Sequence, residues 1–188
     1  MAKTFRGGIC IDEHKNTKKC RIEKLPAPEY VTIPMSQHIG VHCTPLVNAG
    51  DKVYKGQLIG AAVKGLYCPV HSSVSGTVRA IEEKKMTSGL SVLNIVIDND
   101  FENRIDPSIK PFDKKLADTS AEEIIEIVKN AGISGMGGAS FPTFAKIQSA
   151  LGKVDTIIIN CAECEPFITA DHRLLLENPA SVINGLKI

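Results

Sequence analysis

Gly135-Met136-Gly137-Gly138-Ala139-Ser140-Phe141-Pro142-Thr143-Phe144-Ala145-Lys146 is a glycine-dense stretch that runs directly into a predicted helix. Glycine permits positive φ and lets a ligand approach bare main chain. Pro142 suits the first turn of a helix, whose free N–H groups attract anions. Lys146, one turn further on, adds a positive charge near the same helix start. The stretch therefore predicts a phosphate cradle, with a plain turn between two helices as the alternative.

Two standard nucleotide fingerprints do not fit this stretch. The dinucleotide pattern G-x-G-x-x-G fails because Ser140 stands where its last glycine should be, and because the loop follows a predicted helix instead of a strand. The P-loop pattern fails because no Gly-Lys-Ser/Thr follows. The phosphate prediction thus rests on glycine content and on the helix start.

Composition limits the classes of function. A chain of 188 residues allows one large domain or two small ones, and the net charge of +1 with 5% aromatic residues and no Trp argues against nucleic-acid binding. The first residues contain no apolar signal-peptide core, and no eighteen uncharged apolar residues occur in succession. We expect a cytoplasmic chain with no transmembrane segment of its own.

The cysteines and histidines do not predict a metal site. In the cytoplasm, we expect reduced thiols at all six cysteines, which are Cys10, Cys20, Cys43, Cys68, Cys161 and Cys164. Their spacing does not match the run of a cluster ferredoxin, and the histidines form no zinc pattern. Cys161-x-x-Cys164 leaves a redox dithiol or half of a metal site as an open alternative.

The first hundred residues predict an arm followed by a small β domain. Residues 1–30 show little periodicity, whereas residues 31–100 contain short β-rich pieces separated by turn residues, which is typical of a sandwich or barrel. The phrases at 50–60 and 69–78 resemble biotinyl and lipoyl carrier domains. The segment between these phrases looks too short to display an acceptor lysine, so we expect a carrier-like fold without a carried group. Residues 101–118 are polar and contain two prolines, which predicts a linker.

Residues 119–188 predict part of an α/β domain. Ser120-Ala121-Glu122-Glu123 is a capping box that begins a helix, which Gly132 can close. We expect a second helix at 142–151, a strand buried in a parallel sheet at 154–160, a helical piece at 171–177 and a tail at 178–188. One strand cannot complete such a sheet, so either other strands complete it or the chain is the N-terminal portion of a longer protein.

Three polar residues follow the predicted strand, where open α/β sheets bind ligands. Asn160 offers an amide, and Glu163 and Glu165 offer carboxylates that can accept hydrogen bonds from a ribose or a ring N–H. The alternative is that they cap the following helix or face water. The sequence leaves both interpretations open.

Taken together, these phrases resemble the C subunit of the Rnf electron-transport complex over essentially the whole chain. The resembling phrases occur in one order: Gly7-Gly8-Ile9, Ile33 to Gly40, Gly50 to Gly60, Pro69 to Gly76, the glycine stretch, Ala162 to Pro166 and Ile168 to Asp171. The resemblance implies an α+β chain with two domains: a small carrier-like (barrel-sandwich hybrid) β domain, then a truncated α/β flavin-binding domain.

The last phrases also look like the flavin loop of the NADH-binding flavoprotein subunit of respiratory complex I. That resemblance implies FMN contacts at Gly135, Gly137, Gly138, Ala139, Lys146 and Asn160. It also implies that Glu163 and Glu165 lie beside the flavin and the nicotinamide. The chain departs from that pattern at Met136, which replaces an arginine, at Ser140, which replaces a glycine, and at Ala162, which replaces a carboxylate.

The function implied by the resemblance is that of an NAD-linked flavin subunit in a membrane-associated ferredoxin:NAD oxidoreductase complex. Its cofactors would be FMN and NAD(H), and two [4Fe–4S] clusters would lie beyond residue 188. Its partners would be NADH, the other subunits and, indirectly, ferredoxin, on the cytoplasmic face of the membrane. We assign no catalytic residue and expect the 188-residue chain alone to be inactive. The alternatives are a non-catalytic docking module and a related soluble electron-transfer protein that feeds a substrate reductase.

Overall fold

The computed structural model describes residues 11–86, 89–137 and 139–188. The chain divides into two compact units. Pro26–Val154 form one unit, termed the β unit, and the segment up to Leu25 forms a terminal unit with Asp155–Ile188. Both ends of the described chain therefore belong to the same unit.

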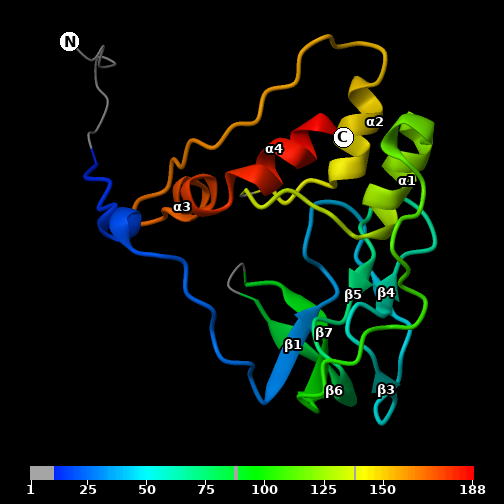
Figure 1. Cartoon of the computed structure of the whole chain (residues 1–188). Helices are drawn as coiled ribbons and strands as arrows, with labels where there is room; N and C mark the ends of the chain where they lie inside the picture. Colours follow the sequence, from blue (N-terminus) through cyan, green and yellow to red (C-terminus); the bar gives the residue numbers. More distant parts are fainter. Residues whose placement is uncertain (1–10, 87–88, 138) are drawn as a thin grey trace. The chain divides into compact units, whose positions relative to one another are not determined.

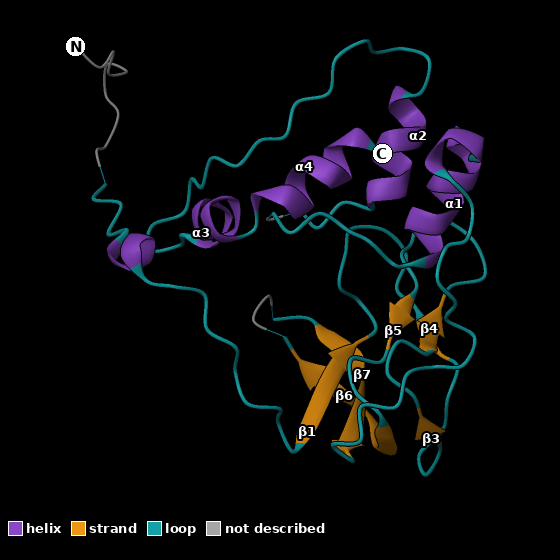
Figure 2. Ribbon diagram, in the orientation of Figure 1, coloured by secondary structure: helices purple, strands orange, loops and turns teal. Residues whose placement is uncertain are grey.

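The β unit contains two small antiparallel sheets, drawn in orange in Figure 2. The larger sheet has the order β1-β7-β6-β3, with strands β1 (Tyr30–Pro34), β7 (Ser91–Asn99), β6 (Gly76–Lys85) and β3 (Lys52–Val53). The smaller has the order β2-β4-β5, with strands β2 (Thr44–Pro45), β4 (Leu58–Ala61) and β5 (Val70–His71). The prediction of short strands separated by turns is confirmed.

The core of the β unit comes from alternating apolar residues on these strands. Ile33 pairs with Ile95, and Val31 pairs with Ile97, so β1 and β7 present branched side chains at matching positions. The buried cluster draws on both sheets: Ile33, Met35, Cys43, Val47, Val53, Ile59, Val70, Val78, Ile95 and Ile97. Burial of this apolar surface is the main force that holds the two sheets together.

Two helices belong to the same unit and lie side by side in Figure 1. Helix α1 (Ala121–Asn130) begins at the predicted capping box: the Glu123 amide donates to Ser120 Oγ over 3.2 Å, and the Ser120 amide donates to Glu123 Oε2 over 3.0 Å. Helix α2 (Thr143–Ala150) begins one residue after Pro142. Ile125 of α1 and Phe144 of α2 pack with Cys68 in a second buried cluster, which fixes both helices to the β unit.

The terminal unit contains a 3₁₀ turn and two helices: η1 (Asn16–Lys19), α3 (Ala170–Glu177) and α4 (Pro179–Lys187). The helix predicted at 171–177 is confirmed. The prediction of a tail at 178–188 is wrong, because helix α4 begins at Pro179. Proline is well suited to the first helical position, where its missing N–H would have no partner in any case.

The predicted strand at 154–160 is also wrong for this structure. These residues form no strand, and the apolar side chains Ile157 and Ile158 are 69% and 82% exposed. A buried parallel strand needs neighbours on both sides, and the described residues provide none there. Among those residues, no helix combines the length and apolarity needed to cross a membrane.

Candidate nucleotide-binding loops

The glycine-dense segment forms a loop closed at its neck. Ser134 pairs with Pro142 in an isolated antiparallel bridge. Around that bridge the Gly135 amide donates to the Phe141 carbonyl over 2.8 Å, and the Thr143 amide donates to the Ile133 carbonyl over 3.1 Å. Residues 135–141, termed the glycine loop, thus lie directly before α2, and these hydrogen bonds hold the two ends of the loop together.

Part of the predicted amide cradle is used internally. The Gly135 amide is taken by the neck, and the Ser140 amide donates to the Gly137 carbonyl over 3.0 Å in a tight turn. The remaining described amides of the loop, those of Met136, Gly137, Ala139 and Phe141, have no hydrogen-bond acceptor in the part of the chain that the structure describes. Those four N–H groups are therefore not used within the described chain, which is the condition that an anion-binding loop must meet. Gly138, the other predicted contact in this loop, lies outside the described residues.

Neither described glycine of the loop is required by the fold. Neither Gly135 nor Gly137 has a left-handed φ. A Cβ at Gly135 would make only ordinary contacts, 3.5 and 3.6 Å from Phe141 main-chain atoms, and a Cβ at Gly137 would meet nothing within 4 Å. The space beside these glycines is therefore open, as expected where a ligand must approach the main chain closely.

Lys146 lies on α2 and is exposed. Its ammonium forms no ion pair with any described residue, so its charge is not neutralised within residues 11–86, 89–137 and 139–188. Helix α2 therefore offers a positive group close in sequence to the glycine loop, as predicted. Met136, at the position of the complex I arginine, is 98% exposed and contributes no charge.

The second predicted group of residues lies in the terminal unit, on residues 160–168, termed the carboxylate loop. Asn160 Oδ1 accepts the Ala162 amide over 3.0 Å, which forms a local turn. The Glu163 carboxylate accepts the amides of Asp171 over 2.9 Å and His172 over 3.5 Å, at the start of α3. The capping alternative thus describes Glu163 in this structure. Glu165 is exposed, and its carboxylate has no hydrogen-bond partner among the described residues.

A cavity of about 220 Å³ lies beside the neck of the glycine loop. Its lining includes His38, Cys68, His71 and Ser134. His38 belongs to the phrase Ile33 to Gly40 and His71 to the phrase Pro69 to Gly76, so these two segments meet at the cavity. His38 has a structural role, because its Nε2 accepts the Cys68 amide over 2.9 Å. Burial lowers the pKa of His71, against a smaller opposing effect of Asp106.

Sequence reasoning missed the residue that holds the carboxylate loop. Lys15 donates from Nζ to main-chain carbonyls of this loop, 148 to 153 residues away in the sequence. In the sequence it belongs to residues 1–30, where little periodicity is present. A contact over such a distance leaves no local pattern that could have revealed it.

Comparison with known proteins gives two matches to family models along the chain. Residues 3–102 match the RnfC Barrel sandwich hybrid domain, and residues 128–188 match the Nuo51 FMN-binding domain. These matches confirm the predicted order of a carrier-like β domain and part of a flavin-binding domain. The exact boundaries predicted at residues 30, 100 and 118 remain predictions.

Curated relatives extend over nearly all of the chain. It is 46% identical over 191 residues to the C subunit of the Na(+)-translocating ferredoxin:NAD(+) oxidoreductase complex of Acetobacterium woodii, and the alignment covers 98% of this chain and 42% of that relative. It is 40% identical over 190 residues to the C subunit of the proton-translocating ferredoxin:NAD(+) oxidoreductase complex of Clostridium ljungdahlii, covering 100% of this chain and 41% of that relative. The C subunit of an ion-translocating oxidoreductase complex of Pectobacterium carotovorum is 40% identical over 190 residues, covering 98% of this chain and 25% of that relative. The chain thus spans well under half the length of these relatives, and the resemblance inferred from its phrases is confirmed.

Proposed function

This chain belongs to the RnfC barrel sandwich hybrid family, and from that premise we propose that it forms the first part of the NAD-linked flavin subunit of a ferredoxin:NAD oxidoreductase complex. In this proposal the glycine loop binds the phosphate of FMN, and the carboxylate loop contacts the nicotinamide nucleotide. The named relatives support the type of complex, and the match to an FMN-binding domain supports the flavin.

One observation carries the flavin assignment beyond family likeness. Gly135 and Gly137 are glycines that the fold does not need, in a loop where four described amides lack acceptors among the described residues. A phosphate accepts hydrogen bonds from several N–H groups at once and needs close approach to the main chain. The amides without acceptors and the open space at Gly137 support this proposal, in which the Lys146 ammonium would add charge attraction.

The residues of this chain would bind and orient FMN and NADH. The flavin would supply the redox chemistry, which is hydride exchange with NADH and single-electron exchange with iron–sulfur centres. Main-chain amides of the glycine loop would fix the phosphate end of the cofactor. Asn160 would contact the flavin, and Glu165 would hydrogen-bond the nicotinamide or its ribose. Glu163, beside them, would hold the carboxylate loop at the start of α3. We assign no proton transfer to any residue.

The wider setting is part of the same proposal. The [4Fe–4S] clusters would be bound beyond residue 188, in the segment that the relatives have in addition. The partners would be NADH, the membrane subunits of the complex and, through them, ferredoxin. The protein would be peripheral, on the cytoplasmic face of the membrane. Purification of the full-length protein without flavin would instead favour a docking module.

The test measures flavin bound by the full-length protein. FMN released on denaturation is quantified per mole of wild type and of Lys146→Ala, with Lys153→Ala as the matched control. Lys153 is also exposed but lies beyond the end of α2. We expect Lys146→Ala to release several-fold less flavin, because a charge-assisted contact to phosphate contributes roughly 1.5–3 kcal/mol. Equal flavin in the two variants would refute the role of Lys146.

A further inference from the structure

Lys15 uses its whole hydrogen-bonding capacity on the carboxylate loop. Its Nζ donates to the carbonyls of Glu163 over 2.9 Å, Glu165 over 2.8 Å and Ile168 over 2.8 Å. A lysine ammonium has three N–H donors and no acceptor. These three bonds therefore leave no donor for an anion, and Lys15 acts on the main chain of the loop.

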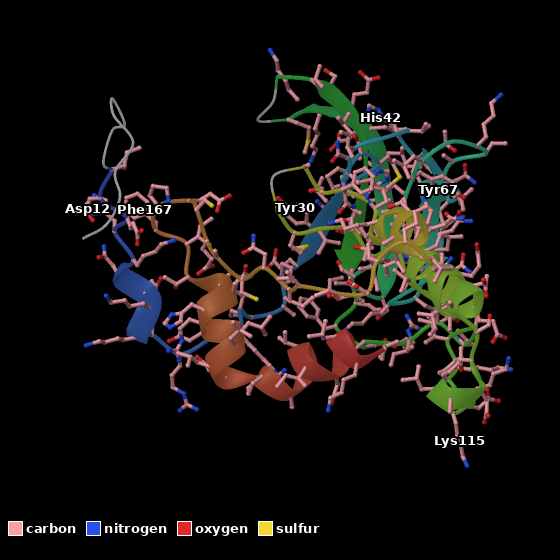
Figure 3. All side chains as sticks on the ribbon, turned by 90° about the horizontal axis from the view of Figure 1, so that it is seen from above. Asp12, Tyr30, His42, Tyr67, Lys115 and Phe167 are labelled. Carbon is pink, nitrogen blue, oxygen red and sulfur yellow. The ribbon has the colours of Figure 1, made fainter. Side chains whose placement is uncertain are left out.

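Neighbouring residues of the same segment reinforce this attachment. The Phe167 amide donates to the Glu13 carbonyl over 2.8 Å, and the Phe167 ring stacks on His14 with 5.1 Å between ring centroids. Thr17 Oγ1 and Thr169 Oγ1 are 2.7 Å apart. Figure 3 shows Phe167 close to Asp12, the residue before Glu13.

The contacts continue along α3. Arg173 Nη1 donates to the Lys18 carbonyl over 3.1 Å, and the Ile22 amide donates to Glu177 Oε1 over 3.0 Å. Residues 13–22, part of the predicted arm at 1–30, are thus bound to both the carboxylate loop and the helix after it. The contacts are spread over the length of this segment, so it does more than link two parts of the chain.

Glu163 and Glu165 differ in how their side chains are held. At Glu163 the main chain is held by Lys15, and the side chain is held by the Asp171 amide at the start of α3. At Glu165 only the main-chain carbonyl is held, and the carboxylate is exposed without a hydrogen-bond partner among the described residues. The result is one carboxylate used for structure and one free carboxylate on a fixed main chain.

We propose that Lys15 is a positioning residue for nucleotide binding: it fixes the main chain at Glu165, so that this carboxylate can accept hydrogen bonds from the amide or ribose hydroxyls of NADH. The inference rests on the proposed function and deepens it. A charge held in place before binding costs less to order when the ligand arrives. Lys15 itself touches no ligand.

The test compares Lys15→Met and Lys15→Arg with Lys19→Met in the full-length protein. Lys19 is on the adjoining 3₁₀ turn, and its ammonium forms no hydrogen bond or ion pair within the described segments. For each variant we measure flavin content, the KM for NADH and kcat with an artificial electron acceptor, and flavin reduction by dithionite. The last assay does not use the nicotinamide site.

We expect Lys15→Met to raise the KM for NADH about tenfold, the effect of losing one well-placed hydrogen bond to a charged group. Flavin content and dithionite reduction should match Lys19→Met. The KM of Lys15→Arg should lie between those of Lys15→Met and Lys19→Met, because a planar guanidinium cannot direct three hydrogen bonds to converging carbonyls as an ammonium does. A purely structural role would lower flavin content and kcat together and leave no selective change in KM.

The outcomes separate the two proposals. Wild-type protein without flavin, or with flavin that NADH does not reduce, refutes the proposed function itself. Wild type that is active, with both Lys15 variants at the KM of Lys19→Met, refutes positioning by Lys15 alone. If Lys15→Met does not fold, Lys15→Arg decides: an unchanged KM overturns the inference, and a selective rise supports it.

Discussion

Substitution of Gly137 by alanine should separate the needs of the fold from those of the ligand. Gly137 has no left-handed φ, and a Cβ there would meet nothing within 4 Å. The folded chain should therefore accept alanine at no steric cost. Alanine also restricts the unfolded chain more than glycine, which stabilises proteins by roughly 0.4–1 kcal/mol at compatible positions. We expect the free energy of unfolding to stay the same or to rise slightly.

The effect on flavin should have the opposite sign. If the FMN phosphate contacts the main chain at this position, the added methyl group keeps it from one or two amides. Each lost bond to a charged group costs roughly 1.5–3 kcal/mol, so the Kd for FMN should rise by at least about tenfold. Because the amides of Met136 and Ala139 would stay available, binding should weaken without being abolished.

The assay is titration of FMN into flavin-free full-length protein, followed by quenching of flavin fluorescence. Urea unfolding of the same variant gives the stability. Gly185→Ala is the matched control, because a Cβ at Gly185 also meets nothing within 4 Å, and Gly185 lies on α4 away from both loops in the sequence. A Gly137→Ala variant that binds FMN as tightly as Gly185→Ala would refute the reasoning.

Two further predictions concern stability. Burial lowers the pKa of His71 below its ordinary value of 6.5, so the folded state disfavours the charged imidazole; stability should be complete above pH 6.5 and decrease as the pH falls from there through the folded-state pKa. Thermal unfolding across this range should show a weaker pH dependence in His71→Gln, and identical profiles would contradict the assignment. Ser140 has φ +44°, a left-handed conformation that is unfavourable for residues other than glycine, so Ser140→Gly should raise the free energy of unfolding by roughly 0.5–1 kcal/mol. Urea unfolding checks this, with Ser140→Ala as a control that keeps the strain; a less stable glycine variant would show that the serine side chain contributes more than the strain costs.

Local signals in the sequence predicted local structure well. The capping box at Ser120 placed the start of α1 correctly, because both of its hydrogen bonds join residues three apart. The short β-rich pieces predicted within residues 31–100 are also found: β1 contains β-branched residues that suit a half-buried sheet, and it pairs with β7. In both cases the information lies in neighbouring residues.

The predictions that failed depended on partners that neighbouring residues do not specify. The apolar run at 154–160 has strand composition, but no described strand lies beside it, and its side chains remain exposed. The attachment of Lys15 to the carboxylate loop joins residues 148 to 153 positions apart. Periodicity and turn chemistry carry no information about either.

In the glycine loop, the positions of the G-x-G-x-x-G pattern differ in what they require of the residue. Ser140, the residue that breaks the G-x-G-x-x-G pattern, adopts a left-handed φ, a conformation that glycine adopts more readily than serine. Gly135 and Gly137, which satisfy the pattern, have no such φ and no close neighbour that requires glycine. The fold therefore favours glycine at position 140, where serine is strained. The proposed ligand favours glycine at positions 135 and 137, where a side chain would keep it from the main chain. Substitutions at 140 should therefore change stability more than flavin affinity, and substitutions at 137 should do the reverse.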